Sequence, residues 1–517
     1  MKRRVLCWDE SCVGKNDGVS VISHKPVKKE LALVCDDEWE GVHNGYASVL
    51  KIGDRYRIYY RADNSRQRID GQKIPGVHGV ICVAESRDGI TYKKPNIGKY
   101  EYNGTKNNNI VFMREEKPID NFSVFYDTNP ACPENERFKA LSEINLGNDN
   151  GGTKLIYYAS ADGYDFREMY YLDVEGTFDS YNVMVWDDAT EQYFLYYRAF
   201  HTPEGEDRLS WNGARPNWIR HIRVATSKDF RTWETHGRIS FKEGQEEYQL
   251  YTNQITRYCR SRDTFIGFPV RYCDRAAEKR NFHHMPLGDR HENITEVYGR
   301  EGTAVTDCVI MTSNDGFKFD RRDEAFLTPG VENRNNWWYG NCYTVYGLIE
   351  TESEEEGAPD EISFYIGENY RIKNVNFRRY TVRLDGFFSW YAPYKGGTVL
   401  TKHFMVGADE MRVNFATSAL GGMTVSLCSE DGEELEGYTS YEMFGDSVDR
   451  PVEFEKPLSA LKGSCVCLKF TLKDAQLYSF EICALGFLLK KARFSSLKLL
   501  TKRSISDIIK IKLATAN

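Results

Sequence analysis

The sequence predicts an all-β protein in which a five-bladed β-propeller is followed by a C-terminal β-sandwich. One kind of strand opening, with a polar first residue, an aromatic third and a small fourth, occurs five times, and a β-rich, blade-sized stretch follows each. After Gly386 the pattern changes to shorter alternating strands between Gly-rich turns, as in a sandwich. The five openings are Asn44-Gly-Tyr-Ala-Ser, Asp120-Asn-Phe-Ser-Val, Asp179-Ser-Tyr-Asn-Val, Gln249-Leu-Tyr-Thr-Asn and Asn341-Cys-Tyr-Thr-Val.

A second repeated element marks the end of the third strand in four of the blades. It reads Ser-x-Asp-Gly, or Ser-x-Asp-Phe in one case, and an aromatic residue follows shortly after. The Asp-Gly step supplies a turn with positive φ, so these aspartates are predicted to shape hairpins. The four copies are Ser86-Arg-Asp-Gly89, Ser160-Ala-Asp-Gly163, Ser227-Lys-Asp-Phe230 and Ser313-Asn-Asp-Gly316.

These patterns divide the chain into four parts. Residues 1–35 lead into the ring or supply its closing strand, and residues 36–387 form the propeller, which is the predicted catalytic domain. Residues 388–483 form the β-sandwich. Residues 484–517 are a basic tail whose apolar residues could make an amphipathic helix.

The composition excludes some classes of partner. The chain has 68 Lys and Arg against 76 Asp and Glu, a net charge of −8, whereas a nucleic-acid surface needs a basic stripe. Aromatic residues make up 14% of the chain, with 33 Tyr and 9 Trp, which suits stacking on sugar faces. Tyr is also a good strand residue, so any one Tyr can be purely structural. We expect a carbohydrate substrate and no nucleic acid.

No cofactor, metal or membrane segment is predicted. The thirteen cysteines include no Cys-x-x-Cys pair, and the pair His283-His284 has no acid at a ligand spacing. The apolar run Val5–Trp8 is shorter than a signal peptide requires, and no run of about 18 apolar residues occurs. We therefore expect a reduced, cytoplasmic protein without stable membrane insertion. No pattern indicates its oligomeric state.

Two openings carry a carboxylate. Asp120 and Asp179 start equivalent strands of neighbouring blades, so both side chains should approach the same axial funnel. Breaking a glycosidic bond requires one carboxylic acid and one carboxylate, and such a funnel can supply both. The structural alternative is that each Asp caps its own turn.

A third acid would have to come from beside an opening. Glu40 is the nearest upstream acid to the first opening and is the candidate base or nucleophile. Asp37, in the same acidic stretch, and Glu247, before the fourth opening, are further candidates. Converging carboxylates would keep one of them protonated near neutral pH.

Sugar recognition should use aromatic platforms and polar side chains near the openings. Arg61 and Arg198 end equivalent second strands, so they should share an orientation and could tune the carboxylates or hold an anionic sugar. The alternative for both is an inter-blade ion pair. The other predicted substrate-binding residues are Trp39, Asn44, Asn182, Trp338 and Asn341.

The two acidic openings carry a family resemblance. Asp120-Asn-Phe-Ser-Val-Phe-Tyr and Asp179-Ser-Tyr-Asn-Val-Met-Val-Trp resemble the second-blade and third-blade strands of five-bladed β-propeller glycoside hydrolases, the invertase/fructanase and arabinanase/xylosidase groups. The segments Trp337-Trp338-Tyr-Gly-Asn341 and Phe470–Phe480 resemble a bacterial group of glycosyl hydrolases.

The resemblance implies roles for both aspartates. It makes Asp120 the residue that stabilises the transition state and Asp179 the blade-three acid. The chain departs from the pattern because that acid is usually Glu, and because His43-Asn44-Gly45 stands where the first blade usually carries Asp.

The leading interpretation is a glycosidase that uses Asp179 as general acid, Glu40 as base or nucleophile and Asp120 to orient sugar hydroxyls. One alternative is a glycoside phosphorylase, in which Arg61, Arg198 and Arg334 would bind phosphate. Another is a glycan-binding propeller without catalysis, in which the aromatic residues matter and the acids do not.

Overall fold

The computed structural model describes residues 2–63, 68–69, 72–73, 79–114, 119–147, 152–210, 217–286, 302–371 and 374–487. Almost all of its regular structure is β-strand, and five blades form a propeller, so the predicted fold class is confirmed. The chain divides into two compact units. One is Ser23–Phe388, and the other joins Met1–Ile22 to Ser389–Asn517. The predicted tail lies outside the described residues from 488 onward.

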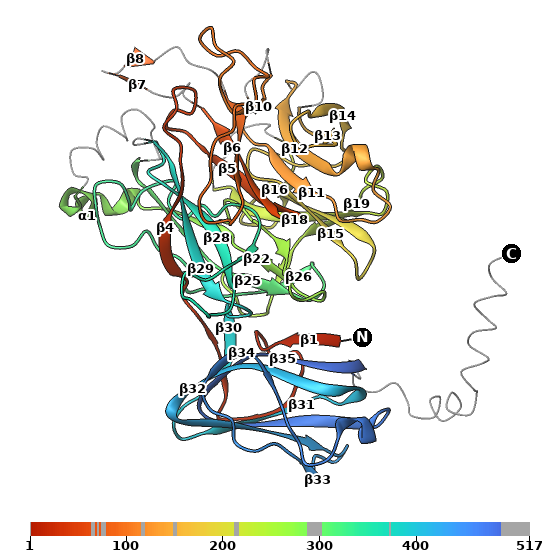
Figure 1. The fold of residues 1–517 in the computed structure, drawn as a ribbon. Coiled ribbons are helices and arrows are strands. Elements are labelled where there is room, and N and C mark those ends of the chain that lie inside the picture. Colours follow the sequence, from red (N-terminus) through yellow and green to blue (C-terminus); the bar gives the residue numbers. More distant parts are fainter. Residues whose placement is uncertain are drawn as a thin grey trace, which may run out of the picture. The chain divides into compact units, whose positions relative to one another are not determined.

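The first three blades each have four main antiparallel strands (Figure 1). Blade one comprises β5 (Gly45–Ile52), β6 (Arg55–Ala62), β9 (Val80–Ser86) and β10 (Ile110–Phe112). Blade two comprises β11 (Ser123–Tyr126), β12 (Phe138–Asn145), β13 (Thr153–Ser160) and β14 (Arg167–Tyr171). Blade three comprises β15 (Val183–Asp187), β16 (Gln192–His201), β18 (Ile219–Ser227) and β19 (Glu234–Arg238), with β17 (Asp207–Arg208) paired to β16.

Blade four carries an insertion and blade five is closed by an N-terminal strand. Blade four comprises β21 (Thr256–Arg257), β22 (Phe265–Gly267), β25 (Met311–Ser313), β26 (Lys318–Arg321) and the edge strand β20 (Ser240–Phe241). Its insertion holds a hairpin, β23 (Val270–Asp274) and β24 (Ala304–Cys308), and the short helix α1 (Lys279–His284). Blade five comprises β27 (Ile349–Thr351), β28 (Glu361–Glu368), β29 (Asn376–Arg383) and β4 (Val27–Val34). A separate short hairpin joins β7 (Arg68–Ile69) to β8 (Gln72–Lys73).

Polar side chains in the openings or directly after them hold the inner strands of neighbouring blades together. The Ser180 hydroxyl donates to the carbonyl of Tyr251 at 2.6 Å, which joins blades three and four. The Gln254 amide donates to the carbonyl of Thr344 at 3.0 Å, which joins blades four and five. The Ser48 hydroxyl accepts from the amide of Val124 at 3.0 Å and so joins blades one and two. At these three boundaries a polar side chain therefore pairs a buried backbone group at the axis, although it stands at a different position of the repeat each time.

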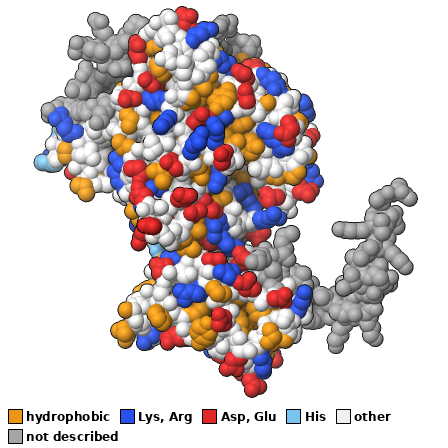
Figure 2. Space-filling model, in the orientation of Figure 1, with side chains coloured by type: hydrophobic (Ala, Val, Ile, Leu, Met, Phe, Trp, Pro, Cys, Tyr) orange, Lys and Arg blue, Asp and Glu red, His pale blue; other side chains and the backbone are white. Residues whose placement is uncertain are grey.

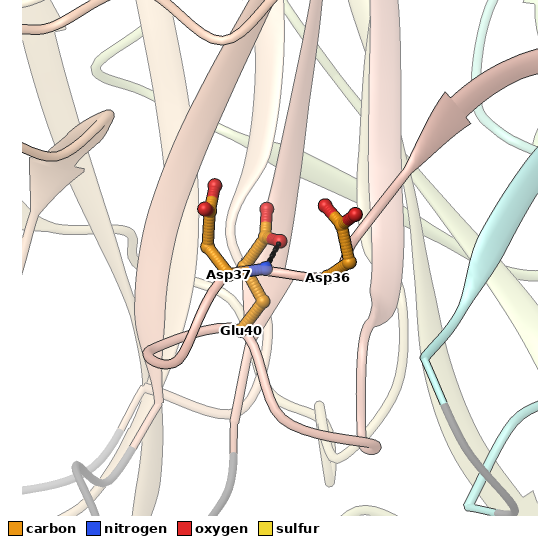
Figure 3. A group of neighbouring side chains, drawn as sticks. All are labelled: Asp36, Asp37 and Glu40. Atoms are coloured by element: carbon orange, nitrogen blue, oxygen red, sulfur yellow. Dashed lines mark hydrogen bonds between the residues drawn. The ribbon is translucent and has the colours of Figure 1, made fainter.

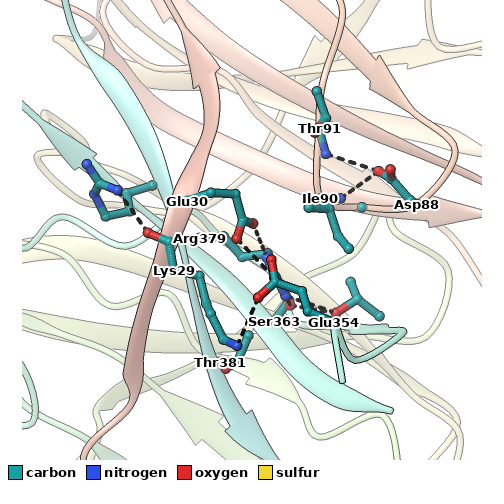
Figure 4. Close-up of polar contacts among 12 residues, drawn as sticks. Lys29, Glu30, Asp88, Ile90, Thr91, Glu354, Ser363, Arg379 and Thr381 are labelled. Carbon is teal, nitrogen blue, oxygen red and sulfur yellow. Dashed lines mark hydrogen bonds and ion pairs between the residues drawn. The ribbon is translucent and has the colours of Figure 1, made fainter. Parts of the chain in front are cut away.

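The closing strand β4 is held by a buried arginine of β29 (Figure 4). Arg379 is fully buried, and its guanidinium binds both carboxylate oxygens of Glu30. Arg379 also donates to the hydroxyl of Ser363 at 3.1 Å on β28. One guanidinium fork therefore joins three strands of the closing blade.

The repeated Ser-x-Asp elements are structural turns. The Asp88 carboxylate accepts hydrogen bonds from the amides of Ile90 and Thr91 at 2.8 and 3.0 Å (Figure 4). Burial opposes ionisation, but these hydrogen bonds lower the pKa of Asp88. The carboxylates of Asp162, Asp229 and Asp315 make the same kind of contacts. These four acids are therefore used by the fold, as their turn chemistry predicts.

The second unit is a nine-stranded sheet that curls into a sandwich-like half-barrel (Figure 1). Two long strands, β32 (Phe404–Cys428) and β35 (Cys465–Phe487), pair along most of their length, and register shifts bend them around an apolar core. N-terminal strands pair into the same sheet. The remaining strands are β1 (Lys2–Leu6), β2 (Val13–Asp17), β3 (Ser20–Ser23), β30 (Phe388–Ala392), β31 (Gly397–Thr401), β33 (Glu434–Thr439) and β34 (Asp446–Pro451).

The surface carries charges of both signs. Figure 2 shows acidic and basic side chains interspersed over the visible face, in keeping with the small net charge of −8. Within the described part of the chain, no helix combines the length and apolar character needed to cross a bilayer.

Candidate functional site

Each of the two acidic openings meets one of the two predicted arginines. Arg61 on β6 approaches Asp120 across the boundary between blades one and two, with 2.6 Å between Nη1 and Oδ1. Arg198 on β16 approaches Asp179 within blade three, with 3.2 Å between Nη1 and Oδ1. The arginine side chains are only 2% and 3% exposed, whereas the aspartate side chains are 45% and 32% exposed. Two carboxylates therefore face solvent, each held by a buried cation.

A third carboxyl group, that of Glu143, joins the same cluster. Glu143 lies near the end of β12, and its amide donates to the side chain of Asn121 at 2.9 Å. Asn121 in turn donates to the carbonyl of Phe178 at 3.0 Å, which ties β12 to the opening of blade three. Burial raises the pKa of Glu143 well above its usual range, the charges of Asp179 and Asp120 raise it further, and Arg198 acts in the opposite direction. Glu143 is therefore suited to carry a proton near neutral pH.

Arg61 is held in place by a buried histidine network. The guanidinium of Arg371 lies 2.9 Å from Nε2 of His43, and Arg61 lies 3.5 Å from the same nitrogen. Because a guanidinium can only donate, Nε2 must accept, and the proton of the neutral ring is on Nδ1. Nδ1 lies 3.0 Å from the carboxylate of Asp63 and donates to it. Burial and the neighbouring charges of Arg61 and Arg371 lower the pKa of His43 well below its usual range, so the ring stays neutral.

Tyrosines form one wall of the cluster. The Tyr46 ring stacks on Tyr181 with centroids 5.4 Å apart, and the Arg61 guanidinium lies 4.9 Å from the centroid of Tyr46. The Arg198 guanidinium lies 4.6 Å from the centroid of Tyr251, whose hydroxyl accepts from Tyr339 at 2.7 Å. Tyr46 and Tyr339 also line a cavity of about 30 Å³, which is large enough for about one water molecule. The wall is therefore packed and rigid.

Strained backbone conformations occur in the openings, directly after one of them and in the histidine network. Tyr46 has φ of 44°, Gln254 39°, Cys342 60° and Arg371 60°. Residues other than glycine rarely adopt positive φ, and for bulky residues this conformation is strained. Such strain persists where the surroundings force it and is typical of functional sites.

Glu40 has a different set of partners. Its side chain is fully buried and accepts from Lys94 at 2.7 Å. It also accepts from the backbone amide of Asp37 at 2.8 Å (Figure 3). Lys94 also binds Asp36 and Asp37 at 2.8 and 2.9 Å. These three carboxylates lie close enough together to hold a metal ion, but the Lys94 ammonium contacts all three and supplies the compensating charge. Burial raises the pKa of Glu40, and Lys94 opposes this rise.

Trp39 and Glu247, two further predicted site residues, also lie against neighbouring side chains. The Trp39 indole donates to Asn109 at 2.9 Å. Glu247 is 58% exposed and lies 2.8 Å from His201.

The side chains of the predicted asparagines lie against backbone groups in and near the openings. Asn182 is buried, donates to the carbonyls of Phe178 and Ser180 and accepts from the amide of Arg198, so its hydrogen-bonding capacity is used. Asn341 accepts from the amide of the buried Trp338 at 3.0 Å. Asn44 is buried, and its side-chain oxygen lies 3.4 Å from the amide of Asp63.

Glu143 was not identified from the sequence, although a signal for it exists. The fifth residues of the first three openings pair with Tyr59, Ala140 and Tyr196. Arg61 lies two residues after Tyr59, and Arg198 lies two residues after Tyr196. Glu143 lies three residues after Ala140. Comparing the ends of all second strands, rather than only the openings, would have pointed to this acid.

Comparisons with known proteins find likeness only among solved structures. No family model and no curated protein matches the sequence. An N-acetylgalactosamine deacetylase from F. plautii, in complex with blood group B trisaccharide, is 10% identical with a TM-score of 0.43, over 71% of this protein and 96% of that one. A complex of BT0996 with RGII is 11% identical with a TM-score of 0.42, over 70% and 93%.

A third structure, the Bombyx mori GH32 β-fructofuranosidase BmSUC1, is 8% identical with a TM-score of 0.38, over 90% of this protein and 94% of that one. At the level of the fold, the resemblance to five-bladed propeller proteins stands on the five blades of this protein itself.

Proposed function

We propose that this protein is a glycosidase whose site is the cluster of Asp120, Glu143 and Asp179. The observation that carries the proposal is that three neighbouring carboxyl groups differ in their partners and in the protonation state that their surroundings favour. Two are paired with arginines, and the third is half-buried and favours its protonated form because of burial and the two neighbouring charges. Hydrolysis of a glycosidic bond needs this combination of an acid and a carboxylate.

Glu143 would act as the general acid. Its proton would pass to the glycosidic oxygen as the bond to the anomeric carbon breaks, and the leaving group would depart as an alcohol. Asp179 would either take a proton from the attacking water or attack the anomeric carbon itself. After water has added, one proton and one hydroxyl have been transferred, and the net reaction is hydrolysis.

Asp120 would orient the sugar. Nη1 of Arg61 donates to the carboxylate of Asp120 at 2.6 Å and to the backbone carbonyl of Asp120 at 2.7 Å. These two contacts fix the position of Asp120. Its negative charge also raises the pKa of Glu143. This assignment gives Glu143 the role that the sequence suggested for Asp179, and it leaves out Glu40, which is neutralised by Lys94.

The proposal is tested by release of reducing ends from a panel of aryl glycosides and polysaccharides, with and without phosphate. Glu143→Gln should lower turnover by about 10²–10⁴-fold, because it cannot donate a proton. Asp179→Asn should be at least as damaging, whereas Glu247→Gln, an exposed acid outside the cluster, should act like the wild type. Wild-type turnover by Glu143→Gln would refute the assignment. A requirement for phosphate would indicate phosphorolysis instead.

A further inference from the structure

The blade-four insertion encloses a large cleft beside the proposed catalytic cluster. The cleft has a volume of about 740 Å³ and is lined by residues of β23, α1, β24 and the loop that leads to the fifth opening. Ligand sites in proteins commonly have volumes of about 300–1,000 Å³. The cleft is thus large enough for several sugar units.

Four aromatic residues line the cleft. Tyr248, Tyr272, Phe282 and Trp337 all line it, with Asn281 as a neutral polar side chain. Flat rings beside hydrogen-bonding groups suit a ligand that has both apolar faces and hydroxyls. A carbohydrate has both.

The cleft is continuous with the wall of the carboxyl cluster. Tyr272 lines the cleft, and its ring lies 6.1 Å from that of Tyr251 and 6.4 Å from that of Tyr339. Tyr251 in turn lies against Arg198, the partner of Asp179. Tyr251 and Arg198 therefore lie between this wall of the cleft and Asp179.

The charges of the cleft favour a neutral ligand. Arg271 and Asp307 form a two-point ion pair within it, at 3.0 and 2.6 Å, so each neutralises the other. The other charged lining residues are one cation, Arg275, and two acids, Glu278 and Glu332. This surplus of acids disfavours a ligand that carries carboxylates.

Trp337 is the most unusual residue of the cleft. Its φ is 63°, a conformation that is costly for a bulky side chain, and its indole donates to the carbonyl of Gly330 at 2.7 Å. Backbone strain of this kind is typical of ligand-binding and catalytic sites.

We propose that this cleft is a distal subsite that binds further units of a neutral oligosaccharide while the scissile bond lies at Asp120, Glu143 and Asp179. The inference rests on the proposed function and narrows the substrate to an oligomer of several sugar units. Trp337 supplies a platform for one of the distant units.

The test is binding of the full-length Glu143→Gln protein to an array of neutral and uronate-containing mono- to hexasaccharides. The Glu143→Gln background prevents turnover if Glu143 is the acid. On that background, Trp337→Ala should weaken binding of neutral tetra- to hexasaccharides by at least about tenfold and leave monosaccharides unchanged. Tyr171→Ala removes an exposed aromatic ring of the outer strand β14 and should change nothing.

A second variant separates binding from folding. Trp337→Gly also removes the ring, but glycine adopts the positive φ without strain, so its melting temperature should not fall below that of Trp337→Ala. Unchanged binding of long oligosaccharides by both variants would overturn the inference, as would binding that does not depend on oligosaccharide length. A Trp337-dependent preference for uronates would overturn the neutral character of the ligand. Failure of the proposed function would show separately, as wild-type turnover by Glu143→Gln.

Discussion

Replacing Arg379 with Met should destabilise the propeller by opening its closing blade. Arg379 is fully buried and binds Glu30 of the closing strand through two nitrogens. Removing one partner of a buried ion pair costs about 3–5 kcal/mol, because the other charge is left without compensation. The Glu30 side chain is 31% exposed, so water recovers part of its solvation, and we expect a loss of about 2–3 kcal/mol.

The measurement is the free energy of unfolding from urea titration. The matched control is Arg378→Met, one residue earlier on the same strand. Arg378 is 21% exposed, binds Glu368 at 2.9 Å and donates to the carbonyl of Lys29 on β4 at 2.8 Å, so both variants lose a contact with β4 and differ in the burial of the ion pair. The loss of Arg378 should cost less than about 1 kcal/mol. Equal destabilisation by the two variants would refute the reasoning, because it would show that burial of the Arg379 ion pair adds nothing.

The pH dependence of the same contact has a defined sign. Burial of Glu30 opposes ionisation, but Arg379 lowers the pKa of Glu30 in the folded protein. The pair therefore stabilises the fold above the ordinary pKa of a glutamate and loses this effect as the pH falls through the lowered value. The difference in unfolding free energy between wild type and Glu30→Gln should be constant near neutral pH and shrink in acid. A difference that grows in acid would contradict this sign.

The remaining predictions concern the axis and the histidine network. Gly347→Ala should cost at least about 2 kcal/mol in unfolding free energy, because an added Cβ would lie 2.4 Å from the carbonyl of Val49 at a φ of 109°. Gly357→Ala, where a Cβ meets open space at φ of 80°, is the control and should cost about 1 kcal/mol. His43→Gln should flatten the loss of stability below about pH 6.5, since a histidine held neutral by the fold takes up a proton on unfolding. An unchanged pH slope would mean that His43 is protonated in the folded protein.

The repeated openings predicted the propeller because they mark a role that every blade repeats. Polar residues in them or directly after them, such as Ser180 and Gln254, join adjacent inner strands, so the axis favours polar residues in this stretch of the blades. The pairing of strands from residues 1–22 with the C-terminal sheet has no such signature, because it joins segments 381 to 481 residues apart without a repeated pattern.

The part of the site that lies at repeated positions could be predicted from the sequence, as the propeller could. Asp120 and Asp179 stand at repeated positions, and Arg61 and Arg198 end equivalent strands, so pattern alone drew attention to them. Glu143 does not repeat, and its importance comes from burial and from two neighbouring charges, which depend on the folded structure. Glu40 was the nearest acid in sequence, but the distance along the sequence says nothing about the neutralising Lys94, which lies 54 residues later.

The protonation state of Glu143 is the most direct test of the account. Infrared difference titration of the wild type against Glu143→Gln reports the carboxyl group of this one residue. We predict that Glu143 is still protonated well above the ordinary pKa of a glutamate, and that Asp179→Asn and Asp120→Asn each lower its pKa, since each removes a neighbouring negative charge. Ionisation of Glu143 in the ordinary range, unchanged by either substitution, would contradict the account.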